Sequence, residues 1–176
     1  MTYYAHLDGN RIIGVLETDA DPGPGYAVIA QPLDFSQRPS AAHKPHLIEG
    51  AVVWVDPHTL EDRKAARWAA IKAERDSREY GGFAWDGSTF DSDAESQRRL
   101  QGAAQLAVLA QAAQQPFEIA WTLADNSVRV LDAADMIQVG AALANHVAAT
   151  HYAARALRQQ IEAATTAAEV EAVAWP

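Results

Sequence analysis

The stretch that decides the fold is Gly81–Asp93, GGFAWDGSTFDSD, which is followed directly by an alanine-rich run. Asp86 and Gly87 stand between aromatic residues, and a two-residue type I′ hairpin turn needs positive φ angles that Asp and Gly tolerate. This turn sets Phe83 opposite Phe90, so aromatic side chains share one small sheet. The stretch therefore predicts an aromatic hairpin built to pack against neighbouring helices.

Helical periodicity dominates the chain on both sides of this hairpin. The predicted helices end at glycines or before Pro116, and begin at capping residues: Ser92 or Asp93, then Asp132, then Thr166 with Glu169 as a capping box. The apolar residues of the second helix cover so wide an arc that we expect neighbours on more than one side. The predicted elements are helices at 60–79, 94–114, 133–163 and a short one reaching Val173, with a β-hairpin formed by 117–123 and 128–131.

The first 59 residues have a different character, because six of the eight prolines of the chain precede residue 60. Alternating apolar residues predict hairpins over 3–16 and 47–55 and a short strand at 26–30, while 31–44 is too rich in Pro and Ser for regular structure. The order of these strands is left open. We therefore predict an α+β protein, with an N-terminal β module at 1–59 and a helical domain with two hairpins at 60–176.

The long helix over 133–163 carries a regular apolar seam. Eight residues follow one another at alternating intervals of four and three, which is the spacing of a heptad repeat. One interpretation is a helix that pairs with copies of itself or with a partner; the other is a buried face inside the protein's own helix bundle. The flanking positions lack paired opposite charges, which favours the bundle, with self-association left open at the 151–161 end. The seam residues are Met136, Gly140, Leu143, Val147, Thr150, Ala154, Leu157 and Ile161.

Composition restricts the classes of function. The chain has no Cys, which excludes disulfides and thiolate metal sites, and its net charge of −9 works against binding to nucleic acid or anionic lipid. No apolar run reaches the roughly 20 residues that span a bilayer, and the N-terminus does not resemble a signal peptide. We therefore expect synthesis in the cytosol and partners that are proteins, with no nucleic acid and no membrane.

The sequence contains no nucleophile, phosphate-binding or metal motif, so we expect no catalytic residue, no metal and no cofactor. His146 and His151 are five residues apart, which separates them by about 140° around a helix and prevents shared metal ligation. Rigid Pro-rich loops on a small sheet lose little entropy when they bind. We therefore predict that the partner contacts the N-terminal module, especially Tyr26, Phe35 and Trp54.

Two segments resemble known phage proteins. GGFAWDGSTFDSDAESQRRLQGA and PFEIAWTLADNSVRVLDAADMIQVGAALANHVAATHYAARALR are similar to a phage-tail domain of undefined biochemistry found beside tail-fibre genes. The opening, YYAHLDGNRIIGVLET, resembles the start of many phage tail-fibre assembly proteins. The resemblances cover 3–16 and about 68–161. They imply a role in the virion or in its assembly, and they supply no catalytic residues.

Three functions follow as hypotheses. The first is a tail-fibre assembly chaperone that binds the phage tail-fibre protein in the host cytoplasm without chemistry. The second is a structural virion component, an adaptor at the fibre or baseplate that forms homo-oligomers through the 136–161 helix and stays in the virion tail. The third, ranked below both, is an enzyme or a glycan-binding module that uses exposed Trp residues.

Overall fold

The computed structural model describes residues 1–176, and its internal contacts divide the chain into two compact units. The first unit is Met1–Asp62, here called the β unit, and the second is Arg63–Pro176, here called the helical unit. Strands in the first unit and helices with two hairpins in the second make the protein α+β, as the sequence predicts.

The β unit contains one five-stranded sheet. Both predicted hairpins form, β1 with β2 and β4 with β5, and the strand order that the sequence left open is β3-β1-β2-β4-β5. Its small core consists of Ala5, Ile12 and Ile29. The strands are β1 (Thr2–Asp8), β2 (Arg11–Thr18), β3 (Tyr26–Ile29), β4 (Lys44–Ile48) and β5 (Ala51–Val55), with a 3₁₀ turn, η1 (Phe35–Gln37), between β3 and β4.

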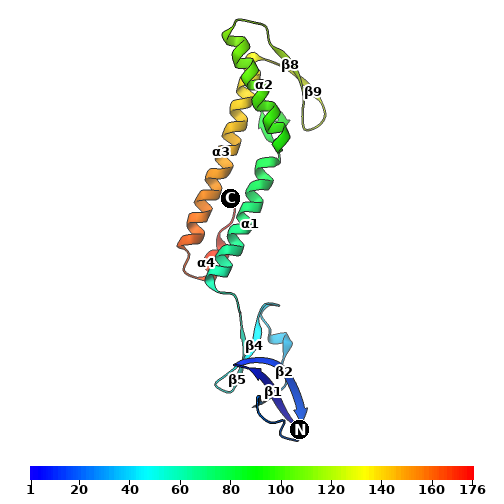
Figure 1. Ribbon diagram of the computed structural model, residues 1–176, viewed down its shortest axis with the longest axis vertical. Coiled ribbons are helices and arrows are strands. Elements are labelled where there is room, and N and C mark those ends of the chain that lie inside the picture. The colour runs from blue at the N-terminus through cyan, green and yellow to red at the C-terminus, as the bar shows by residue number, and fades with distance from the viewer. The chain divides into compact units, whose positions relative to one another are not determined.

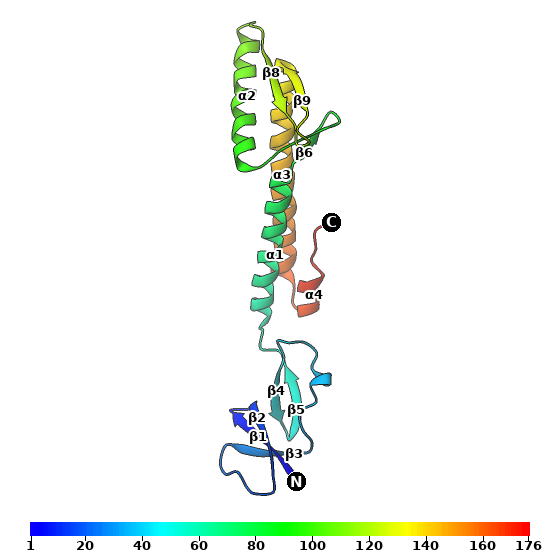
Figure 2. The same ribbon diagram turned by 90° about the vertical axis from the view of Figure 1, so that its right-hand side faces the viewer.

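In the helical unit two helices lie one after the other along the longest helix. Figures 1 and 2 show α1 (Leu60–Tyr80) beside the C-terminal half of α3 (Ala133–Ala163), and α2 (Ala94–Ala112) beside its N-terminal half. The short hairpin β6 (Phe83–Trp85) and β7 (Ser88–Phe90) connects α1 to α2. The remaining elements are β8 (Glu118–Thr122), β9 (Val128–Asp132) and α4 (Ala167–Ala172).

The aromatic hairpin forms in the predicted register. Phe83 pairs with Phe90, and the turn residues Asp86 and Gly87 have φ angles of 45° and 74°. Both phenylalanines are buried, Phe90 completely, and their rings stack with centroids 5.6 Å apart. The hairpin is thus part of the core between α2 and α3, because burial there removes its aromatic side chains from water.

The capping predictions are also confirmed. The Asp93 carboxylate accepts the N–H groups of the first turn of α2, Asp132 caps α3, and Thr166 and Glu169 form both bonds of the capping box. Ser92 has a different role: its buried hydroxyl donates to the carbonyl of Glu79 and accepts the N–H of Gly82, at 2.5 and 2.8 Å. It therefore ties the end of α1 to the start of α2.

Only one face of α2 is covered, so the expectation of neighbours on more than one side is wrong. Leu100, Ala103 and Ala107 pack against α3, while Leu106 and Leu109 are 60% and 59% exposed. The abundant alanines of this helix produce a wide apolar arc without requiring a second neighbour. None of the helices is long and apolar enough to cross a membrane.

Candidate binding pocket on the β unit

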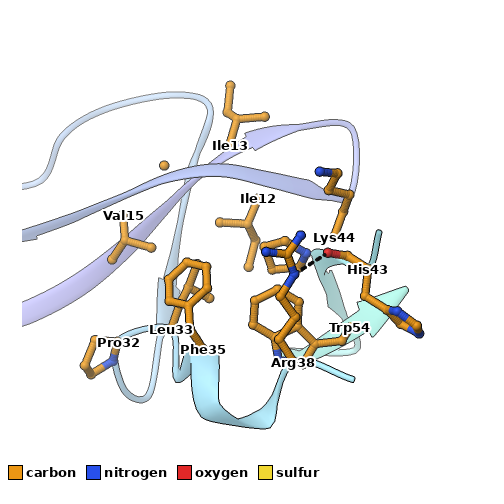
Figure 3. A pocket seen from close by; sticks show the side chains of 12 residues that line it. Ile12, Ile13, Val15, Pro32, Leu33, Phe35, Arg38, His43, Lys44 and Trp54 are labelled. Carbon is orange, nitrogen blue, oxygen red and sulfur yellow. Dashed lines mark hydrogen bonds between the residues drawn. The ribbon is translucent and has the colours of Figure 1, made fainter. Parts of the chain in front are cut away.

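The β unit has an open apolar pocket of about 510 Å³, lined on one side by β2 and on the other by the loop that follows β3. Figure 3 shows Phe35 and Trp54 facing this space together with Ile12 and Val15. Phe35 is 63% exposed, and its ring centroid lies 5.5 Å from that of the half-buried Trp54. The β unit thus holds a large apolar side chain at the mouth of a pocket, in contact with solvent.

The 3₁₀ turn η1 fixes the position of Phe35. The carboxylate of Asp34 accepts the backbone N–H of Ser36 at 2.9 Å and its hydroxyl at 2.6 Å. These two hydrogen bonds, the side-chain bond first, lower the pKa of Asp34, because they stabilise the charged carboxylate. The turn is therefore closed by local bonds, which leaves the Phe35 ring free to face outward.

The pocket opens because β2 and β4 separate after a single pair, Arg11 with His46. Beside that pair, the N–H of Leu47 donates to the carbonyl of Asn10 at 2.8 Å. Alternate residues of a strand direct their backbone groups to the same side, so the next donor toward β2 would be residue 45. Residue 45 is Pro45, which has no N–H. The ladder therefore stops there, and the rest of β2 carries no strand on that side.

Two cations line the pocket and no acidic residue does. The guanidinium of Arg38 lies 5.8 Å from the centre of the Trp54 ring and donates to the carbonyls of His43, at 3.0 Å, and Ala41. Lys44 is half-buried, and its ammonium group has no hydrogen bond or ion pair. In residues 1–62 there are only three Lys or Arg residues against nine Asp and Glu residues, so this pocket concentrates most of the positive charge of an acidic unit.

The structure brings together two of the three predicted contact residues. Phe35 and Trp54 share the pocket, whereas Tyr26 lies on β3 and stacks its ring on His6 with centroids 4.6 Å apart. Arg38 and Lys44 are not among the residues predicted from the sequence. Two features of the sequence could have identified them: Lys and Arg are scarce in this unit, and Pro45 stands next to a predicted hairpin. The partner-binding role of Tyr26, Phe35 and Trp54 stays a prediction.

The seam of α3 faces the chain's own helices. Its first half lies in one core with α2 and the aromatic hairpin, and its second half lies in another core with Ile71 of α1 and Val173 of the C-terminal segment. Gly140 and Val147 are half-buried and the other six seam residues are buried. This burial favours the bundle interpretation: the buried side chains at Met136, Leu143, Thr150, Ala154, Leu157 and Ile161 are covered within one chain.

The histidines of α3 contact the end of α1. His151 Nε2 lies 2.9 Å from the Glu79 carboxylate, which is buried, and the ring of His146 stacks on Phe83 with its Nε2 3.1 Å from the carbonyl of Arg78. No group of three or more His, Asp or Glu side chains is placed to hold a metal ion. These contacts hold α1 against α3 at the junction of the two cores.

Comparison with known proteins places most of the helical unit in one family. Residues 62–174 match the family described as domain of unknown function DUF4376. The match covers more than half of the chain, and the protein therefore belongs to this family. No curated protein and no solved structure matches the chain significantly.

Proposed function

We propose that this protein is a phage tail-fibre assembly chaperone that binds the tail-fibre protein through the β unit, without catalysis. The observation that carries the proposal is the pocket in which the exposed Phe35 stands beside Trp54. An exposed aromatic ring over an apolar pocket is typical of protein-binding surfaces, where a few residues, often aromatic ones or Arg, carry most of the binding free energy.

The choice of partner rests on the sequence resemblances. The opening of the β unit resembles phage tail-fibre assembly proteins, and this opening forms β1 and β2, whose second strand lines the pocket. The helical unit supplies the family membership, and its family has no assigned function. A chaperone needs a surface that recognises an unassembled subunit and releases it, which an open pocket on a small sheet can provide.

The alternative is a structural component of the virion, an adaptor at the fibre or baseplate. The observation that favours it is the apolar surface left uncovered on α2, where Leu106 and Leu109 face solvent. In this case the helical unit oligomerises through α2, since the α3 seam is occupied by the chain's own side chains.

Co-purification tests the proposed partner. The chain is co-expressed with a phage tail-fibre protein, and we expect the two to co-purify through the β unit. Phe35→Ser should abolish co-purification and leave the melting temperature unchanged, because the ring is mostly in water. Val28→Ser is the matched control, since Val28 is 58% exposed in the same sheet and does not line the pocket. Equal retention of the fibre protein by both variants would contradict the proposal.

Virion composition separates the two functions. A chaperone acts during assembly and leaves, so mass spectrometry of purified particles should find the fibre protein without this chain. A chain present in a fixed ratio to the fibre protein would instead establish the structural alternative.

A further inference from the structure

The free edge of β2 and the pocket beside it together define the kind of segment that they can accept. Beyond Arg11, β2 is bonded to β1 on one side and to no strand on the other. Unpaired backbone groups along a strand are a template for one more strand. The pocket begins at this same edge, because its lining includes Ile13, Gly14 and Val15 of β2.

Charge distinguishes the β2 edge from the β5 edge. The outer edges of β3 and β5 are also free, since both strands end the sheet. The hollow beside β5 is lined by Asp34 and by no Lys or Arg, whereas the pocket at the β2 edge has Arg38 and Lys44 and no carboxylate. A carboxylate is therefore attracted to the β2 edge and repelled from the β5 edge.

We propose that an extended segment of the fibre protein adds as a strand to the free edge of β2, and that it carries an apolar and an acidic side chain two positions apart. Side chains two apart lie on the same face of a strand, and the pocket offers an apolar wall and two cations on one face. The apolar side chain enters between Ile12, Phe35 and Trp54, and the carboxylate pairs with Lys44 and Arg38. This inference rests on the proposed function, because it names the segment that the fibre protein contributes.

The charge part is tested with the full chain and the full-length fibre protein. Lys44→Glu should weaken binding by about tenfold or more, because it replaces attraction with repulsion at the rim. The loss should shrink in high salt, which screens partly exposed charges. Arg155→Glu is the matched control: Arg155 is exposed on α3 with no ion pair, and its reversal should change the Kd by less than about twofold. Arg38 is left intact, since it holds two loop carbonyls.

The strand part is tested with fluorescent synthetic peptides of about 12 residues that tile the fibre sequence, a length that covers one strand. The tightest peptide is then N-methylated at alternate residues in two complementary sets. Only alternate N–H groups of an added strand face β2, so one set should lose binding and the other should keep it.

The outcomes separate this inference from the proposed function. If the fibre protein binds but Lys44→Glu has no more effect than Arg155→Glu, or both methylated sets bind equally well or equally poorly, the strand inference is wrong and the function stands. If the fibre protein does not bind the unaltered chain, the proposed function is wrong and the inference falls with it.

Discussion

Gly140 shows how one residue sets the distance between two helices. A Cβ atom at this position of α3 would lie 2.8 Å from the Cβ of Ala104 on α2, a distance that atoms of this kind do not tolerate. The neighbouring atom belongs to a short side chain and cannot rotate away. Gly140 therefore permits the close approach of α2 and α3, and the alanines of α2 match it on the other side.

Two glycine-to-alanine changes with the same chemistry should have opposite effects. Gly140→Ala should destabilise the helical unit by roughly 1–3 kcal/mol, since overpacking exceeds the gain in helix propensity. Gly102→Ala is the control: Gly102 is exposed within α2, nothing lies within 4 Å of its Cβ position, and alanine should stabilise by about 0.5–1 kcal/mol. Urea unfolding of both variants measures the difference. A stabilising Gly140→Ala would mean that the helices are further apart than described.

Asp93 makes the helix cap sensitive to pH. Hydrogen bonds from the Ser96 hydroxyl and backbone N–H lower the pKa of the Asp93 carboxyl, so its stabilising effect is complete above its unfolded pKa of about 3.9 and is lost as pH falls through the lower folded value. Asp93→Asn keeps a capping oxygen without the charge. We expect the wild-type chain to have a higher melting temperature than this variant at pH 7, and the difference to disappear in acid. A gap that does not change with pH would show that the carboxylate charge has no role.

At the scale of single residues, local chemistry was predictable and distant contacts were not. The caps at Asp93 and Asp132 and the turn at Asp86-Gly87 depend on neighbours within a few positions, and all of them form as predicted. Arg38 was missed, because its place beside Trp54 depends on how a loop without regular structure folds over the sheet.

At the scale of elements, the spacing of the α3 seam predicted a buried face but could not identify what covers it. The same 4-3 spacing serves a homo-oligomer and an intramolecular bundle, because both bury one stripe of a helix. The structure covers the first half with α2 and the hairpin and the second half with α1 and the C-terminal segment. For α2 the prediction was wrong: its wide apolar arc predicted burial on more than one side, but one apolar stripe is exposed.

Two leucine-to-aspartate changes test which stripe is internal. Leu143 of α3 is only 2% exposed. Leu143→Asp should unfold the helical unit, because the free-energy cost of burying an unpaired charge exceeds the unit's stability. Leu109→Asp on the uncovered stripe of α2 should leave the fold intact. Circular dichroism reports whether each variant folds, and light scattering reports its oligomeric state. A folded Leu143→Asp monomer from a wild-type oligomer would place the seam between subunits instead.

At the scale of the whole molecule, the two units differ in how much core each possesses. The helical unit has two clusters of buried residues, whereas the β unit has three buried apolar side chains under a sheet in which β2 and β4 share one residue pair. Domains of about 60 residues are marginally stable because they bury a smaller fraction of their surface than larger domains do. The composition of the first 59 residues predicted a separate β module, but its strand order depends on pairings between distant segments that no local pattern encodes.

A chain that lacks residues 1–57 tests which of the two units binds the fibre protein. This fragment keeps Thr59, whose hydroxyl accepts the N–H of Asp62 at 3.1 Å. In return, the Asp62 carboxylate accepts the hydroxyl and the N–H of Thr59. The start of α1 therefore remains capped. We expect it to fold, because the buried residues of both helical cores lie after residue 62. Co-purification with the fibre protein should be lost, because Phe35, Trp54 and the β2 edge are removed. A fragment that unfolds would show that the helical unit depends on the β unit for stability. A folded fragment that binds the fibre protein with full affinity would place the binding surface in the helical unit, and the exposed stripe of α2 would then be the first surface to test.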